Sequence, residues 1–162
     1  MPDKINKFIM MKKLLPLLLV FILFSCQKSV VYTETSDDFE DNRWMAKDVK
    51  TFSFKLKEDI DAGDIKLKFS HVYDPQYLTV PVAVTIEGPS GEKENILLNL
   101  QLKDADGNDL SECSGDICDL HTFIKENVPL KKGDYKITLQ NKFAYEYLAN
   151  ALAVGISVER ED

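Results

Sequence analysis

The sequence predicts an all-β fold, an antiparallel β-sandwich of the jelly-roll or Ig-like type, because three features agree. Apolar and polar residues alternate over several short segments, as in strands with one buried face. Clusters of Gly, Pro, Asp and Ser separate these segments, as turns do. No stretch has comparable helical periodicity, and parallel strands would need helical crossovers, so the strands should pair antiparallel. The length of 162 residues suits a single domain.

Six segments carry the alternation. In the first, Phe52, Phe54 and Leu56 share one face, and the later segments also place apolar residues at every second position. The six expected strands span residues 51–56, 64–71, 81–86, 95–102, 135–139 and 153–158. Turns are expected where Gly stands with Asp, Pro or Ser, at 61–64, 88–91, 104–107 and 131–134. Residues 120–128 could form a short helix or a further strand, and the strand is preferred.

Residues 1–25 have the features of a secretory signal peptide. Four lysines accompany the apolar run 14–24, which is shorter than the ~20 residues that span a bilayer as a helix. The run is followed by Ser25 and Cys26, and residues 23–26 resemble a bacterial lipobox, in which the thiol is acylated and the chain is cut before the cysteine. Lipidation of Cys26 is therefore expected. The alternative is a secreted protein in which this cysteine is incidental.

The chain should therefore have three parts: a lipoprotein signal peptide at 1–25, the lipidated cysteine and a tether at 26–43, and a β-sandwich domain at 44–162. Residues 27–41 are mostly polar, so they should form either an extended linker or an edge strand laid on the domain. Two or more acyl chains together hold a protein stably on a membrane. The first expected partner is thus the membrane itself, through the lipid anchor.

The domain is acidic. The net charge is −7 for the whole chain and −10 without residues 1–25, which contribute four lysines and one aspartate. Such a surface repels phosphate backbones, so nucleic acid is not an expected partner.

Few residues suit catalysis. The chain has two histidines, His71 at the end of an expected strand and His121, and neither belongs to a Gly-x-Ser-x-Gly or His-Glu-x-x-His motif. A lone histidine at a strand end is usually structural. The sequence therefore does not predict an enzyme, and no phosphate-binding or dinucleotide-binding loop predicts a cofactor.

Asp104, Asp106 and Asp109 are the best candidates for a metal site, because clustered carboxylates suit Ca²⁺. They depart from the EF-hand pattern, since Gly107 comes too early and Cys113 stands six residues later, where that pattern has Glu. A segment rich in Asp and Gly needs only turn chemistry, so a hairpin turn is favoured over a metal site.

Cys113 and Cys118 flank a glycine and lie five residues apart. Outside the cytoplasm such a pair can close a small disulfide ring, and a disulfide that staples a loop is expected here. The alternatives are two free thiols, or a zinc site for which His121 and nearby carboxylates would have to complete the four ligands.

Five aromatic residues lie outside the clearest strand interiors and could form a surface for a ligand, such as a glycan, or for a partner protein. These residues are Trp44, Tyr73, Tyr77, Tyr145 and Tyr147. They could also plug the ends of the sandwich, so only their gathering on one surface would indicate binding.

Several short features occur in an ordered series along the chain. They are Cys26, Trp44 and the segments 51–54, 77–81, 89–91, 115–119, 133–135 and 154–159. Together they resemble the GldH family of gliding-motility-associated lipoproteins. The resemblance implies an envelope lipoprotein grouped with the gliding and type IX secretion apparatus, with no catalytic residues to carry over. It favours the outer membrane, and the absence of an acidic run directly after Cys26 favours a domain that faces the periplasm.

The sequence therefore leaves two alternative hypotheses for the function. The first is a non-enzymatic accessory or assembly lipoprotein that binds other envelope proteins through loops or sheet edges. The alternative is a glycan- or ligand-binding lipoprotein, with aromatic residues aligned in one groove and assistance from Ca²⁺ beside Asp104 and Asp106.

Overall fold

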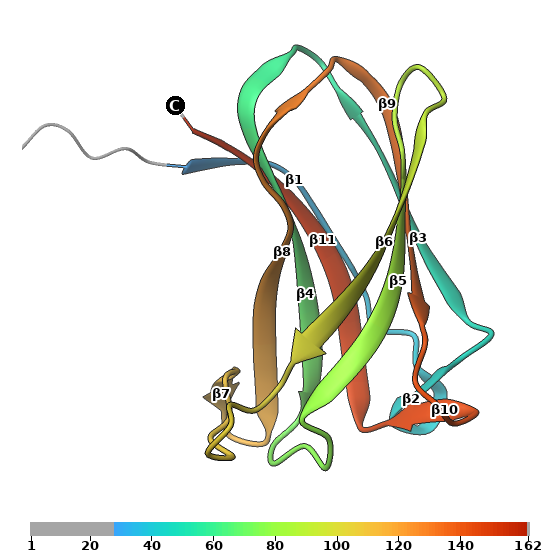
Figure 1. Cartoon of the computed structure of the whole chain (residues 1–162), viewed down its shortest axis with the longest axis vertical. Helices are drawn as coiled ribbons and strands as arrows, with labels where there is room; N and C mark the ends of the chain where they lie inside the picture. Colours follow the sequence, from blue (N-terminus) through green and yellow to red (C-terminus); the bar gives the residue numbers. More distant parts are fainter. Residues whose placement is uncertain (1–27, 162) are drawn as a thin grey trace, which may run out of the picture.

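Two antiparallel β-sheets face each other across one apolar core (Figure 1). The computed structural model describes residues 28–161, so the expected signal peptide 1–25 and the expected lipidation site Cys26 lie outside the described residues. A single 3-10 turn, η1 (Glu40–Asn42), interrupts the strands of this part of the chain. The strands are β1 (Lys28–Ser36), β2 (Arg43–Met45), β3 (Val49–Leu56), β4 (Ile60–Val72), β5 (Thr79–Glu87), β6 (Lys93–Gln101), β7 (Glu112–Ser114), β8 (Ile117–Leu130), β9 (Gly133–Asn141), β10 (Tyr147–Ala149) and β11 (Ala151–Glu161).

The two large sheets have the strand orders β1-β11-β4-β8-β7 and β3-β9-β5-β6. β2 and β10 form a separate two-stranded sheet at one end of the sandwich (Figure 1). The paired strands run antiparallel, and the chain passes repeatedly from one large sheet to the other, for example from β3 through β4 to β5. The expected all-β antiparallel sandwich is therefore confirmed.

Alternating apolar side chains from both sheets fill the core, as the sequence pattern predicts. In β4, Ile65, Leu67 and Phe69 are each at most 1% exposed, while Lys66 and Lys68 between them point to the other face. Burying an apolar side chain of this size contributes about 1.5–3 kcal/mol. A slip of one residue in the register would bury the lysines instead, so the alternation fixes how β4 pairs.

Residues 120–128 belong to β8, so the strand expected there is confirmed and the helical alternative is not formed. β8 pairs antiparallel with β4, from Leu130 opposite Ile60 to Ile117 opposite Val72. Within residues 28–161, no helix is long and apolar enough to cross a membrane.

The expected tether at 26–43 is folded over its described part, and its boundary needs correction. Residues 28–36 form β1, an edge strand that pairs with β11, which is the second of the two alternatives for this segment. The chain then continues through η1 into β2. No β1 side chain is fully buried, so backbone pairing with β11 contributes more to holding this strand in the sheet than an apolar face does.

Candidate functional site

The sandwich has two ends of different character. The anchor end holds the start of β1, two positions after Cys26, together with the end of β11 (Figure 1). The far end holds the β4–β5 loop, the β2–β10 sheet and β7 (Figure 1). A lipid on Cys26 would therefore place the far end away from the membrane.

Exposed apolar side chains gather at the far end. Most of the large exposed apolar residues of the described chain lie on its loops and strand ends: Val49, Tyr73, Leu78, Leu110, Ile117, Tyr145 and Tyr147. A single exposed apolar residue is ordinary, whereas several at one end of a domain single out that end as the candidate site.

Three rings in contact form the aromatic cluster of the far end: Tyr77, Phe143 and Tyr145. The ring centroids of Tyr77 and Phe143 lie 4.4 Å apart in an edge-to-face arrangement, and those of Phe143 and Tyr145 lie 5.4 Å apart. Two residues further along, the Tyr147 ring lies 4.9 Å from the Arg43 guanidinium carbon. Tyr145 is 70% exposed, whereas Tyr77 and Phe143 are half-buried and pack against the core, so the cluster presents mainly the Tyr145 ring to solvent. Tyrosine and arginine are the residue types that dominate binding at protein interfaces.

Buried Asn141 holds the loop that carries Phe143. The Asn141 side-chain N–H donates to the Trp44 carbonyl oxygen at 2.9 Å, and its Oδ1 accepts from the Phe143 backbone N–H at 2.8 Å. The Ala46 N–H also donates to the Glu146 carbonyl oxygen at 2.9 Å. The aromatic cluster is thus fixed to the body of the sandwich at several points.

One predicted surface residue is wrong, because Trp44 belongs to the core. Trp44 is 0% exposed, its ring centroid lies 5.7 Å from that of Phe39 and 6.5 Å from that of Phe69, and its indole N–H donates to the Asp48 carbonyl oxygen at 2.9 Å. It plugs the end of the sandwich and offers no surface to a ligand or partner. The three-residue strand β2 is too short for its sequence to show which side faces the core.

The other predicted aromatic residues are distributed over the far end. Tyr77 lies in the cluster with Tyr145, while Tyr73 is 59% exposed and its backbone N–H donates to the Asp116 carbonyl oxygen of the β7–β8 turn. Sequence reasoning missed Phe143, the ring that joins the two tyrosines. The alternation of aromatic residues at 143, 145 and 147 is the signal that could have identified it.

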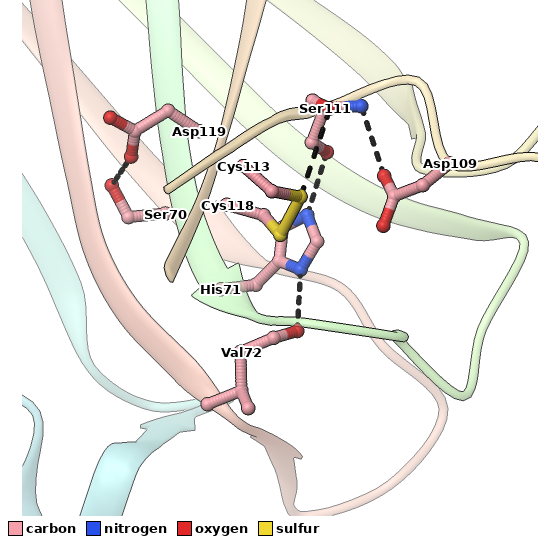
Figure 2. Close-up of a disulfide and its surroundings, with 8 residues drawn as sticks. All are labelled: Ser70, His71, Val72, Asp109, Ser111, Cys113, Cys118 and Asp119. Atoms are coloured by element: carbon pink, nitrogen blue, oxygen red, sulfur yellow. Dashed lines mark hydrogen bonds between the residues drawn. A yellow bond between two sulfur atoms is a disulfide. The ribbon is translucent and has the colours of Figure 1, made fainter. Parts of the chain in front are cut away.

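The disulfide expected between Cys113 and Cys118 is present and crosses the β7–β8 hairpin, with an S–S distance of 2.04 Å (Figure 2). The Asp109 carboxylate lies within 4.8 Å of both sulfur atoms. A metal requires thiolates, and the two sulfurs are already bonded to each other, so neither free thiols nor a zinc site describes this pair.

His71 lies buried beside this hairpin (Figure 2). Its Nδ1 is 2.9 Å from the Val72 carbonyl oxygen and its Nε2 is 2.7 Å from the Ser111 hydroxyl oxygen. A carbonyl oxygen only accepts, so Nδ1 donates to Val72, and Nε2 shares the second hydrogen bond with the Ser111 hydroxyl. The ring is 2% exposed and bound on both sides, so this contact ties the loop before β7 to the end of β4.

Asp104 acts as a turn residue. Its Oδ1 accepts from the backbone N–H groups of Asp106 and Asn108 at 2.9 Å each, and its Oδ2 accepts from the Asn108 side chain at 2.9 Å. These hydrogen bonds, the one from the Asn108 side chain first, hold the pKa of the Asp104 carboxyl below its usual range.

Asp109 faces the disulfide hairpin instead of the turn (Figure 2). Its Oδ1 accepts from the Ser111 backbone N–H at 2.9 Å, and its Oδ2 is buried without a hydrogen-bond partner among the described residues. Within residues 28–161, the potential ligand atoms that come close together belong to Asp109, Cys113 and Cys118. Asp104, Asp106 and Asp109, the three aspartates considered for Ca²⁺, do not come together in this way.

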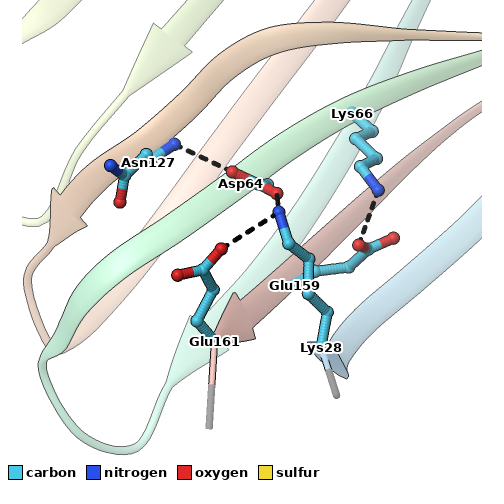
Figure 3. Close-up of polar contacts among 6 residues, drawn as sticks. All are labelled: Lys28, Asp64, Lys66, Asn127, Glu159 and Glu161. Carbon is cyan, nitrogen blue, oxygen red and sulfur yellow. Dashed lines mark hydrogen bonds and ion pairs between the residues drawn. The ribbon is translucent and has the colours of Figure 1, made fainter. Parts of the chain in front are cut away.

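At the anchor end, a buried carboxylate holds the start of β1 (Figure 3). Asp64 of β4 is 3% exposed; its Oδ2 lies 2.7 Å from the Lys28 ammonium, and its Oδ1 accepts from the Asn127 backbone N–H at 2.8 Å. Burial opposes ionisation of Asp64, but the hydrogen bonds from Lys28 and Asn127 outweigh it, so the pKa of Asp64 lies below its usual range. Glu161 adds a second carboxylate 3.4 Å from the same ammonium. The first residue of β1 is thereby fixed to the sheet.

The model of the GldH lipoprotein family matches residues 30–158, nearly the whole described chain. A search of curated proteins finds no match.

Solved structures align with most of the chain, but only at low similarity. Latent PorU from Porphyromonas gingivalis is 9% identical over 86% of this chain and 13% of its own, with a TM-score of 0.37. The Aeromonas sobria serine protease and chaperone complex is 7% identical over 91% and 29%, with a TM-score of 0.38. A CocE/NonD family hydrolase from Staphylococcus aureus is 8% identical over 82% and 33%, with a TM-score of 0.41. The chain spans a third or less of these proteins, and such likenesses support no functional inference.

Proposed function

Because this chain belongs to the GldH lipoprotein family, and is thus a lipid-anchored protein of the cell envelope, we propose that it acts as a non-enzymatic accessory or assembly component that binds other envelope proteins through its far end. The observation that carries the proposal is the gathering of exposed apolar side chains, the aromatic cluster among them, at the end opposite the anchor.

Two physical features of the far end support binding. The Cys113–Cys118 disulfide and the hydrogen bonds of Asn141 hold its loops in one arrangement, so little conformational entropy is lost when a partner binds. A lipid anchor also confines the protein to the membrane plane, which raises its effective concentration for partners in the same membrane.

We place the protein at the outer membrane with its domain in the periplasm, and we expect components of the gliding and type IX secretion apparatus as partners. The family and the absence of an acidic run after Cys26 support this placement. Protease digestion of intact cells tests it. A protected domain would agree with a periplasmic location, and removal of the domain would contradict it.

Crosslinking in living cells, affinity purification of the lipidated protein and mass spectrometry test the accessory role. The wild-type protein should recover the same gliding or secretion components in every replicate. Replacing both Tyr145 and Tyr147 with Ala should reduce that recovery about tenfold or more, as expected when residues central to an interface are truncated. Both side chains are exposed, so the variant should still fold.

Two controls make the test specific to the far end and to the anchor. Leu97 is 65% exposed in the middle of β6, so Leu97→Ala removes a comparable exposed side chain elsewhere and should leave recovery unchanged. Cys26→Ala should abolish recovery, because the protein would no longer be held at the membrane. No reproducible partner, or equal recovery with the double tyrosine variant, would contradict the proposal.

The aromatic cluster also favours a second candidate function, the binding of a glycan or another ligand, because sugar rings stack on exposed tyrosine faces. Affinity electrophoresis in gels containing peptidoglycan or capsular polysaccharide tests this alternative. Retardation of the wild-type domain that is lost in Tyr145→Ala would favour glycan binding, and equal mobility in gels with and without glycan would count against it.

A further inference from the structure

We propose that the anchor end is itself a docking surface for the headgroup layer of an anionic phospholipid membrane, and that this contact holds the sandwich upright on the bilayer. The docking patch consists of two exposed valines and three basic residues: Val30, Val31, Lys55, Lys57 and Arg160. The inference rests on lipidation of Cys26 and is independent of which partner the far end binds.

Chain length brings this patch to the membrane. Lys28, the first residue of β1, stands two positions after Cys26. An extended chain spans at most about 3.6 Å per residue, so the start of β1 lies within about 7 Å of the lipidated residue. The contact between Lys28 and buried Asp64 opposes any lengthening of this link by unpeeling of the strand.

A β-bulge turns two neighbouring valines outward next to this link. The register between β1 and β11 shifts between Val30 and Tyr32, which leaves Val31 as an extra residue. In a regular strand one of two successive side chains faces the core, but here Val30 is 61% and Val31 is 42% exposed. Tyr32 then turns inward onto Phe54, with ring centroids 4.5 Å apart. Both valines are therefore free to enter a headgroup layer.

Basic side chains surround the valines. The patch borders a surface hollow of about 330 Å³, whose lining includes Lys55, Lys57 and Arg160 and the single acidic residue Glu58. Glu58 pairs with Arg160, while Lys55 lies 3.4 Å from Asp134 outside the hollow. The lining thus has more basic than acidic groups, on a domain whose net charge is −10 without residues 1–25. Anionic headgroups should attract this part of the surface and repel most of the remainder.

The test places an environment-sensitive fluorophore at the anchor end of the full lipidated protein, reconstituted in vesicles of phosphatidylethanolamine and phosphatidylglycerol. The probe is attached at Val30→Cys, and the control probe at Leu78→Cys, an equally exposed position at the far end. The emission of the Val30 probe should shift to the blue and be quenched by brominated lipids, while the Leu78 probe should behave as in water. Identical, water-like spectra at both positions would overturn the proposal.

Charge reversal separates docking from anchoring. Lys55→Glu with Lys57→Glu should abolish the blue shift while the lipid still holds the protein on the vesicles. The matched control, Lys47→Glu with Lys142→Glu, makes the same change in net charge at exposed positions of the far end and should leave the blue shift intact. If Lys55→Glu with Lys57→Glu left the blue shift of the Val30 probe unchanged, the proposed contact of the docking patch with lipid headgroups would be overturned. Loss of wild-type protein from the vesicles would overturn the anchor at Cys26, and neither result bears on partner binding at the far end.

Discussion

Replacing Asp64 with Asn should loosen the start of β1. The Asp64 carboxylate is 3% exposed and accepts from the Lys28 ammonium at 2.7 Å and the Asn127 N–H at 2.8 Å. An Asn side chain keeps the shape but has one carbonyl oxygen and no charge, so it can serve only one of these donors well. A hydrogen bond to a charged group contributes about 1.5–3 kcal/mol, so the free energy of unfolding should fall by about 2 kcal/mol. For a domain of this size, that corresponds to a decrease in Tm of roughly 6–10 °C.

The same substitution should change how stability depends on pH. The folded-state pKa of Asp64 lies below the unfolded value of about 4, so its ionised form stabilises the folded state at every pH above that unfolded value. This stabilisation is lost as the pH falls through the lower folded-state pKa. The difference in the free energy of unfolding between the wild type and Asp64→Asn should therefore have its largest value at pH 7 and should decrease below about pH 4.

Thermal unfolding followed by circular dichroism, at pH 7 and at a series of values down to pH 3, measures both effects. Asp61→Asn is the matched control, because Asp61 is exposed on the same strand three residues earlier and should change Tm little. Amide hydrogen exchange should accelerate more in β1 than in the other strands when Asp64→Asn is compared with the wild type. A variant Tm equal to that of the wild type at pH 7, or a deficit that stays constant at low pH, would refute the reasoning that ionised Asp64 holds this strand.

Three further outcomes follow from the structure. Gly155→Val should displace β1, because a Cβ at that position lies 2.7 Å from the Thr35 hydroxyl oxygen and 2.8 Å from a backbone oxygen of β1; hydrogen exchange should accelerate in β1, and unchanged protection would contradict the close packing. Replacing Cys113 and Cys118 with Ser should lower the free energy of unfolding in urea by about 2 kcal/mol, the chain entropy of so small a closed loop; equal urea midpoints would count against this. Ca²⁺ should leave the Tm of the wild type unchanged in a thermal-shift assay with and without chelator, whereas a Ca²⁺-dependent rise that disappears in Asp104→Ala would restore the metal interpretation.

Period-two alternation located the long strands because it reports burial directly. The segments expected at 51–56 and 153–158 lie within β3 and β11, and the observed strands extend beyond the expected ends. The same signal fails for β1, whose side chains are mostly exposed, and for β2, β7 and β10, which have three residues each and cannot show a period. Strand order is not a local property, so no pattern along the chain could reveal that β1 pairs with the last strand.

The candidate site was predictable as a set of residue types but not as an arrangement. An aromatic side chain with a polar tip suits both a core and a surface, so nothing local distinguished buried Trp44 from exposed Tyr145. Phe143 was missed because phenylalanine is expected in the core, and its contact with Tyr77 joins positions far apart in the sequence. The disulfide was easier to predict, since both of its cysteines lie on one short hairpin.

If the far end binds a partner as proposed, the folding of β1 determines how far from the membrane that contact is made. A flexible tether over 26–43 would let the domain move freely around its lipid, but with β1 paired to β11 a single residue, Gln27, separates the described strand from Cys26. The distance from the membrane to the far end is then set by the length of the sandwich. The 13 residues of β4, at about 3.3 Å each, extend roughly 40 Å. A rigid spacer presents its surface at one height and not over a range of heights, which favours partners whose own binding surface lies at a fixed distance from the membrane. Under the proposed function, Asp64 and Glu161 at the start of β1 and the aromatic cluster of the far end would therefore serve one arrangement, although they lie at opposite ends of the molecule.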